Sequence, residues 1–320
     1  MYETTKAQQG KEALVRGVTK GWYGFVWMIK IIIPISFATA LLAWSGWMEY
    51  LNFLIQPVMD IVNLPSIAAL PLIIGMLTGI YGGVASMAVL PLTMNQMILV
   101  ATFLLIAHNL IQEGAIQGKS GIHPLEATLF RLVVATMTVF IVAQFLDMSS
   151  SIPQKDIDSA TFEQPLFITM LRDWGTVAAA LIGRIFFIIM FILTVLEVMK
   201  SFDGINQIVR LLSPLLHAMG LSRRVGILWL TAIIFGLAYG GAVIVEEVKN
   251  GNLSKGELEE LHLSIGINHA MIEDPALFLP LGIHPFWLWV PRLAVAIVAV
   301  RILTLWQLVR TRYRSPSQHP

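Results

Sequence analysis

The chain has 320 residues, of which 56% are hydrophobic and only 13% are charged, and its formal net charge is +1. A soluble domain of this length carries roughly twice that charged fraction, so the composition predicts a chain embedded in lipid. The near-neutral balance gives no basis for nucleic acid as a partner. The absence of cysteine excludes disulfides, thiolate metal sites and cysteine nucleophiles.

The chain begins with a basic segment. Residues 1–21 carry Lys6, Lys11, Arg16 and Lys20 without the apolar core and cleavage site of a signal peptide, and we expect them to form a cytoplasmic amphipathic arm. Six apolar stretches then approach the roughly 20 residues that a membrane span needs. They are residues 22–46, 96–113, 123–146, 174–199, 258–280 and 286–308.

Two further apolar stretches, residues 66–90 and 226–248, carry a glycine pair near their centres. Such a pair either allows close packing of a spanning helix or forms the tip of a re-entrant helical hairpin. The hairpin alternative leaves only Lys155 and Arg172 in the segments outside the cell, and it agrees better with the preference of basic residues for the cytoplasm. The two tips are then expected at Tyr81, Gly82, Gly83, Tyr239, Gly240 and Gly241.

The chain also contains an internal repeat. The sequence Gly-Ile-His-Pro at residues 121–124 recurs at residues 282–285, and Arg131 recurs as Arg292, both at an offset of 161 in the numbering. The two Tyr-Gly-Gly motifs recur at an offset of 158. Between these landmarks, His108-Asn109 with Glu113 matches Asn268-His269 with Glu273 at an offset of 160.

These observations predict an all-α integral membrane protein made of two inverted-topology repeats, each with three spanning helices and one re-entrant helical hairpin. Because each repeat crosses the membrane an odd number of times, the second enters from the opposite side, as in transporters that build a midplane site. The expected parts are a cytoplasmic N-terminal arm (1–21), a first repeat (22–146), an extracytoplasmic linker (147–173), a second repeat (174–308) and a cytoplasmic tail (309–320).

This pattern resembles the Gate, or nucleoside-recognition, domain family of membrane proteins. The resemblance is carried by the two Tyr-Gly-Gly turns, the His-Asn and Asn-His helices and the closing Arg-Leu helices, and covers about residues 22–308. Relatives by this domain include the core of concentrative nucleoside transporters, the membrane domain of ferrous-iron transporters and small spore-maturation proteins. The resemblance implies the fold and leaves the substrate open. The GTP-binding domain of the iron transporters has no counterpart, since no G-x-x-x-x-G-K-[ST] motif is present.

Polar residues inside the apolar stretches are the candidate site. An ionised carboxylate at membrane depth is costly and usually faces a cavity or a partner. At helical spacing Asn109 and Glu113 share one face, as do His269 and Glu273. The expected solute-binding or ion-coupling residues are His108, Asn109, Gln112, Glu113, Asn268, His269, Glu273 and Asp274, with Arg131 and Arg292 as charge partners. The alternative is that these groups only fix helix packing by hydrogen bonds.

The preferred interpretation is a secondary transporter for a small polar, nucleoside-like solute, coupled to H⁺ or Na⁺. One alternative is a divalent metal-ion permease, although the sequence shows no close pair of histidines at ligand spacing. Under the preferred interpretation no metal site or cofactor is expected. Another is a membrane scaffold or signalling protein that does not transport. No enzyme motif is present. We expect the bacterial inner membrane, with both termini cytoplasmic, as the location, and the nucleoside-carrier relatives make a homo-oligomer reasonable.

Overall fold

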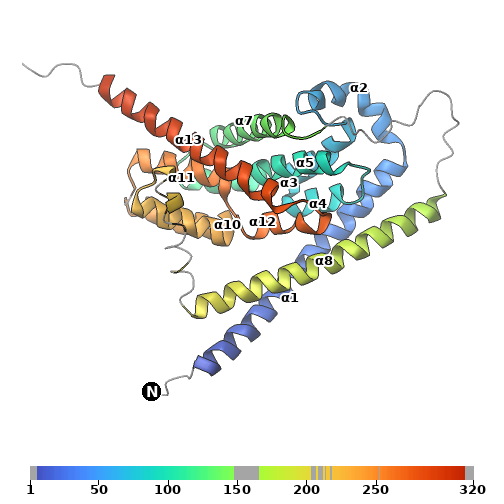
Figure 1. The fold of residues 1–320 in the computed structure, drawn as a ribbon, viewed down its shortest axis with the longest axis horizontal. Helices are drawn as coiled ribbons and strands as arrows, with labels where there is room; N and C mark the ends of the chain where they lie inside the picture. Colours follow the sequence, from blue (N-terminus) through green and yellow to red (C-terminus); the bar gives the residue numbers. More distant parts are fainter. Residues whose placement is uncertain are drawn as a thin grey trace, which may run out of the picture.

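A computed structural model describes residues 6–147, 166–202, 218–251 and 253–313, together with a few positions between 207 and 216. Every element in this part of the chain is a helix (Figure 1). Among the described residues, five helical segments are long and apolar enough to cross a membrane: Lys6–Trp44, Met94–Lys119, Pro124–Ala143, Phe167–Ser201 and Pro285–Gln307. The prediction of an all-α membrane protein is therefore confirmed.

The two longest helices, α1 (Lys6–Trp44) and α8 (Phe167–Ser201), pack against each other in antiparallel orientation along one side of the molecule (Figure 1). A Cβ at Gly17 of α1 would lie 2.7 Å from the Cα of Thr194, near the end of α8. Near the other end of the pair, Trp174 Nε1 donates a hydrogen bond of 3.2 Å to Ser36 Oγ. Glycine in the N-terminal half of α1 thus lets the two backbones approach closely there.

Two of the predicted boundaries fall inside these helices. The described part of the N-terminal arm, residues 6–21, is continuous with the first span and belongs to α1. The end of the predicted linker, residues 167–173, is helical and belongs to α8, which begins at Phe167. Residues 148–165 of the linker and residues 314–320 of the tail lie outside the described residues.

Two helical hairpins follow the long helices. The first consists of α3 (Ala69–Thr78) and α4 (Ile80–Met87), preceded by the short 3-10 turn η1 (Ser66–Ala68). The second is α10 (Arg223–Lys249), whose backbone turns at Gly236. It folds back on itself, because a Cβ at Gly240 would lie 2.6 Å from the Cα of Ala232. The corresponding close approach in the first hairpin joins Gly75 and Gly83.

The hairpin tips are not where the sequence analysis placed them. The chain turns at Gly79 (φ 96°, ψ 179°) and at Gly236 (φ 76°, ψ 171°), conformations that are open almost only to glycine. Tyr81, Gly82 and Gly83 lie inside α4, and Tyr239, Gly240 and Gly241 lie beyond the turn of α10. The glycine pairs serve the close contact between the two legs, which also needs a residue without a bulky side chain.

Two of the predicted spans contain a helix break near their middle. The predicted span 96–113 is α5 (Met94–Ala107) followed by α6 (Leu110–Lys119), with a break at His108 and Asn109. The predicted span 258–280 is α11 (Lys255–Asn268), the short α12 (Glu273–Ala276) and the 3-10 turn η2 (Leu279–Leu281). Asn109 is the N-cap of α6, and its carbonyl accepts a hydrogen bond of 3.0 Å from the N–H of Glu113. The second predicted pair does not share a helical turn, because His269 lies before the break and Glu273 begins α12.

The remaining helices include two that pack on the broken ones. Helix α2 (Trp47–Asp60) follows α1, and α7 (Pro124–Ala143) and α13 (Pro285–Tyr313) close the two halves, each starting at a proline. In α5 the run from Ile98 to Ala107 is buried on all sides, which identifies this helix as the centre of the core. Helix α5 packs on both α7 and α13.

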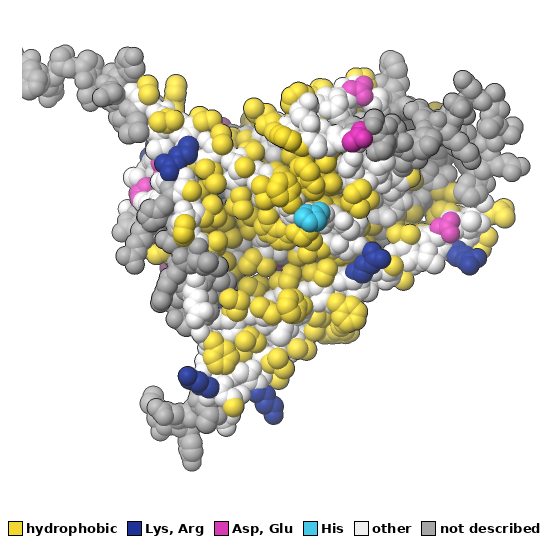
Figure 2. All heavy atoms as spheres, viewed as in Figure 1, with side chains coloured by type: hydrophobic (Ala, Val, Ile, Leu, Met, Phe, Trp, Pro, Cys, Tyr) yellow, Lys and Arg dark blue, Asp and Glu magenta, His cyan; other side chains and the backbone are white. Residues whose placement is uncertain are grey.

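The outer surface agrees with a lipid environment. Large apolar side chains are exposed over the outer helices, among them Met137, Phe187, Phe191, Ile302 and Leu305. On the face shown in Figure 2 apolar side chains form a broad area, and the charged side chains lie mainly toward its edges. A water-soluble monomer rarely exposes so large an apolar surface.

Candidate functional site

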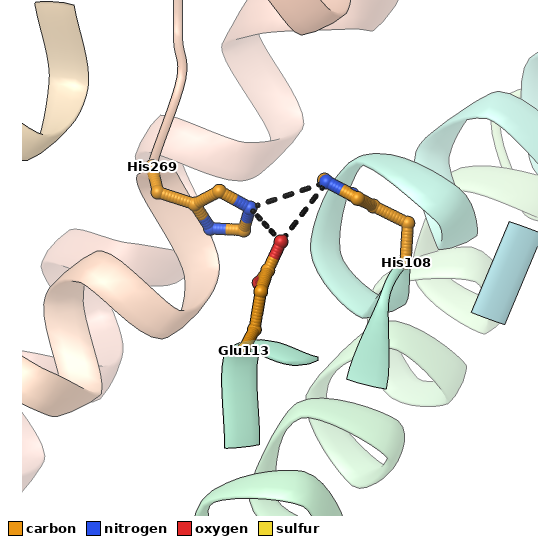
Figure 3. A group of neighbouring side chains, drawn as sticks. All are labelled: His108, Glu113 and His269. Carbon is orange, nitrogen blue, oxygen red and sulfur yellow. Dashed lines mark hydrogen bonds and ion pairs between the residues drawn. The ribbon is translucent and has the colours of Figure 1, made fainter. Parts of the chain in front are cut away.

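Two histidines from opposite halves of the chain meet in the buried centre. His108 follows the last residue of α5 and His269 follows the last residue of α11. Both have extended backbones, and each is followed by a residue with positive φ, Asn109 and Ala270. The two rings lie 5.0 Å apart between centroids, and their Nε2 atoms are separated by 3.4 Å. Figure 3 shows both rings pointing toward the carboxylate of Glu113.

The breaks that carry these histidines are stabilised by the hairpins. At the left-handed residue of the first break, Asn109 N–H donates to the carbonyl of Gly75 at 3.0 Å. At the second break, Ala270 N–H donates to the carbonyl of Ala232 at 3.2 Å. Backbone groups freed by a helix break inside a membrane protein need such partners, so the hairpin legs fix the position of each break.

Each histidine has its ring orientation fixed by its own helix. His108 Nδ1 lies 2.8 Å from the carbonyl oxygen of Leu104, and His269 Nδ1 lies 2.9 Å from that of Ile265. A carbonyl oxygen can only accept, so these contacts assign the proton to Nδ1. In the neutral rings both Nε2 atoms then direct a lone pair into the centre.

Glu113, in the first turn of α6, divides its two oxygens between different partners. Its Oε1 lies 3.2 Å from Nε2 of His108 and 3.2 Å from Nε2 of His269. Its Oε2 forms an ion pair of 2.7 Å with Nη1 of Arg131. The carboxylate is therefore neutralised on one side and directed at both imidazoles on the other.

Asp274 completes the cluster from the second half of the chain. Its Oδ2 lies 3.4 Å from Nε2 of His108 and 4.0 Å from Nε2 of His269. Its number exceeds that of Glu113 by 161, the same offset that separates the two histidines. The structure thus aligns His108 with His269 and Glu113 with Asp274, and corrects the predicted offset of 160 between these segments.

Two buried arginines hold the broken helices in the same way. Arg131 donates from Nε to the carbonyl of Ile106 at 2.8 Å and from Nη2 to that of His108 at 2.9 Å. Arg292 makes the equivalent bonds to Ile267 at 3.0 Å and to His269 at 2.9 Å. A cation at a helix C-terminus satisfies the last carbonyls and the helix dipole.

The two arginines differ in their charge partner. Arg131 forms the ion pair with Glu113, as the sequence analysis expected of a charge partner. Arg292 Nη1 is buried with no hydrogen-bond partner among the described residues, and none of their carboxylates lies within 4.0 Å of Arg292. The carboxylate in the equivalent place is Asp274, whose side chain is one methylene shorter than that of Glu113.

A cavity of about 270 Å³ lies against the cluster. We call it the central cavity. Its polar lining includes Glu273, which accepts a hydrogen bond from the hydroxyl of Tyr81, and Asn109, whose Nδ2 donates to Gln112 Oε1 at 3.0 Å. Trp27 of α1 and the two hairpin glycines Gly79 and Gly236 line it as well.

A second cavity of about 390 Å³ lies between α6, α7 and α11, and we call it the lateral cavity. Its rim carries the exposed residues Glu126 and Lys255, and its interior reaches the buried Arg131 and His262. Glu113 lines the central cavity and its ion-pair partner Arg131 lines the lateral one. The Arg131–Glu113 pair therefore separates the two cavities.

The structure brings most of the predicted site residues together. Around the central cavity it places His108, Asn109, Gln112, Glu113, His269, Glu273 and Asp274, together with the predicted hairpin residue Tyr81. Asn268 is different, since it ends α11, is fully buried and lacks a hydrogen-bond partner for its amide among the described residues. Sequence reasoning missed Gly79, Gly236 and Trp27. Gly79 recurs as Gly236 at an offset of 157, a signal in the sequence that was overlooked in favour of the Tyr-Gly-Gly motifs.

One relative supports the class of protein. The chain is 26% identical over 296 residues to an uncharacterized membrane protein of Bacillus subtilis (strain 168), YvoD, and the match covers 92% of this chain and 94% of that protein. This chain is a membrane protein. No family model and no solved structure matches it. The resemblance to the Gate family, stated above from the sequence motifs, therefore stays a prediction.

Proposed function

We propose that this protein is a membrane transporter that binds a small positively charged solute at the centre of two inverted halves. The observation that carries the proposal is the buried cluster of His108, Glu113, His269 and Asp274, to which each half contributes one histidine and one carboxylate from a helix break. Discontinuous helices meeting at a central polar site are the arrangement that secondary transporters use.

The antiparallel pairing of α1 with α8 supports the inverted relation of the halves. These helices open the two repeats, so repeats of opposite orientation require them to run in opposite directions. The matching arginine bonds, hairpin glycines and helix breaks, at offsets of 157 to 161 in the numbering, support it further. Both termini then lie in the cytoplasm of a bacterial inner membrane, as the distribution of Lys and Arg favours.

The cavities on the two sides of the Arg131–Glu113 pair suggest a path for the solute. A transporter must open its site to one side of the membrane at a time, and a buried ion pair between two cavities is a suitable gate. The repeat offset of 161 relates Glu126 and Gln117 of the lateral cavity to Trp287 and Phe278, which are bulky and apolar. The equivalent positions of the second half thus carry apolar side chains, which favours access beside the first half.

The charges around the central cavity support a cation as the cargo. Glu113, Glu273 and Asp274 supply three carboxylates around the central cavity, and Arg131 and Arg292 supply two guanidinium groups. The excess of negative charge in a region of low dielectric favours a cation over a neutral nucleoside-like solute.

The absence of cysteine makes the test direct. Gln112→Cys in the central cavity and Glu126→Cys at the rim of the lateral cavity are each introduced into the full chain and treated with a membrane-impermeant thiol reagent in right-side-out and inside-out vesicles. We expect the two positions to react from opposite sides of the membrane. Reaction of both from the same side would refute the proposed path.

Phe187→Cys on the exposed outer face of α8 serves as the matched control. It faces neither cavity, so the reagent is not expected to modify it efficiently from either side. Its efficient labelling would mean that the vesicles are leaky.

A further inference from the structure

The geometry points to a divalent transition-metal cation as the ligand of the central cluster, held by His108, His269 and Glu113, with Asp274 as the fourth ligand. This inference rests on the proposed transport function, because the metal ion would be the positively charged solute that is carried. The first three residues have ligand atoms that lie within 4.8 Å of one another and are all buried.

The spacing of the ligand atoms fits a single ion. Four ligands at about 2.0–2.1 Å from a tetrahedral metal lie about 3.3 Å from one another. Here Glu113 Oε1 lies 3.2 Å from each Nε2, the two Nε2 atoms are 3.4 Å apart, and Asp274 Oδ2 lies 3.4 Å from Nε2 of His108. The distance of 4.0 Å from Asp274 to His269 is longer and marks Asp274 as the more loosely placed ligand.

The chemistry of these atoms favours a positive charge between them. With Nδ1 of both rings donating to backbone carbonyls, the converging atoms are two nitrogen lone pairs and two carboxylate oxygens, all of them acceptors. Asp274 Oδ2 is buried and has no hydrogen-bond partner among the described residues. Four acceptors at such distances repel one another unless a metal ion or a proton lies between them.

The surroundings have the features of an outer shell around a metal ion. Metal-binding histidines commonly donate their second ring N–H to a backbone carbonyl, as His108 does to Leu104 and His269 does to Ile265. The ligating carboxylate is in turn held by a charged group, here Arg131 on the far oxygen of Glu113. All of these partners belong to helices, which hold the ligand side chains in fixed orientations.

The donor set indicates the class of metal. Two imidazole nitrogens favour first-row transition metals such as Zn²⁺, Co²⁺, Ni²⁺ or Fe²⁺ over Mg²⁺ and Ca²⁺, which prefer sites made of oxygen ligands. The chain has no thiolate to select Cu⁺. The sequence analysis found no histidines at ligand spacing, because the two ligands belong to different halves of the chain and only the fold joins them.

The test uses Co²⁺, whose visible absorption reports both binding and coordination number. Full-length protein purified in detergent is titrated with Co²⁺, and we expect one ion per chain with the intense d–d bands of a four-coordinate site. His269→Gln and Glu113→Gln should each lower the affinity by more than about 100-fold, since even outer-shell changes cost about 10–100-fold.

His284→Gln is the matched control, because this histidine is exposed and lies outside both cavities. It should bind Co²⁺ like the unmodified protein. Absence of saturable Co²⁺ binding by the unmodified protein would overturn the inference, as would full binding by a His269→Gln variant that retains its helical circular dichroism.

The proposed metal site and the proposed transport function can be refuted separately. Saturable Co²⁺ binding without Co²⁺ flux into proteoliposomes would overturn transport and leave the metal site standing. Labelling of Gln112→Cys and Glu126→Cys from opposite sides, without Co²⁺ binding, would overturn the metal ligand and leave the proposed path standing.

Discussion

Replacing each buried arginine by methionine separates the structural role of these residues from their role toward the cluster. Arg131→Met and Arg292→Met remove the same two hydrogen bonds to helix-terminal carbonyls, so this part of the cost is shared. Only Arg131→Met also leaves a buried carboxylate, that of Glu113, without its ion-pair partner. We therefore expect Arg131→Met to be the more destabilising change.

The difference can be worked out from the distances. At an effective dielectric constant of about 20, opposite charges 2.7 Å apart attract by about 6 kcal/mol, and charges at 4.0 Å by about 4 kcal/mol. No carboxylate of the described residues comes within 4.0 Å of Arg292, so no single pair that it forms with them exceeds the second value. The free energy of unfolding should thus differ between the variants by roughly 2 kcal/mol, or about 30-fold in the equilibrium constant.

The assay is an unfolding titration of the detergent-purified variants, followed by far-ultraviolet circular dichroism. A double variant, Arg131→Met with Glu113→Gln, should recover much of the loss, because the amide needs no counter-charge. Equal destabilisation by Arg131→Met and Arg292→Met, or no recovery in the double variant, would refute the assigned role of the ion pair.

Three further substitutions test individual parts of the fold and site. Gly79→Ala should destabilise the protein by about 1–3 kcal/mol, because its backbone conformation is nearly restricted to glycine although a Cβ would meet no close atom. Gly17→Ala should also destabilise the protein by about 1–3 kcal/mol, because the added Cβ would clash with the backbone at Thr194. Thermal unfolding measures the stability of both glycine variants. Tyr81→Phe removes the hydrogen bond to Glu273 beside the cavity, and should weaken Co²⁺ binding much less than His269→Gln does.

Gly175→Ala in α8 is the control for both glycine variants, because no atom lies within 4 Å of a Cβ added there. It should leave the unfolding transition unchanged or slightly raise it. A neutral Gly79→Ala would mean that the first hairpin does not turn at this residue. A loss of Co²⁺ affinity in Tyr81→Phe equal to that in His269→Gln would place the ligand in the cavity itself instead of in the cluster.

The sequence by itself determined that the chain lies in lipid, and it gave the approximate positions of the helices. A low charged fraction and long apolar stretches are read directly from composition, and the hydrophobic cost of placing them in water fixes the class of protein. The recurrence of Arg131 as Arg292 also predicted equivalent roles. Both residues make the same pair of bonds to the end of a broken helix.

The tertiary structure decided where the helices break and which side chains meet. A break at His108 depends on a carbonyl of Gly75 that accepts from Asn109, and this partner lies far away in the sequence, in the first hairpin. The pairing of His108 with His269 requires the two halves to be packed together, because neither helix alone brings a second imidazole near the first. Local periodicity reports which face of a helix is apolar, whereas a site shared by two distant segments is fixed only by their packing.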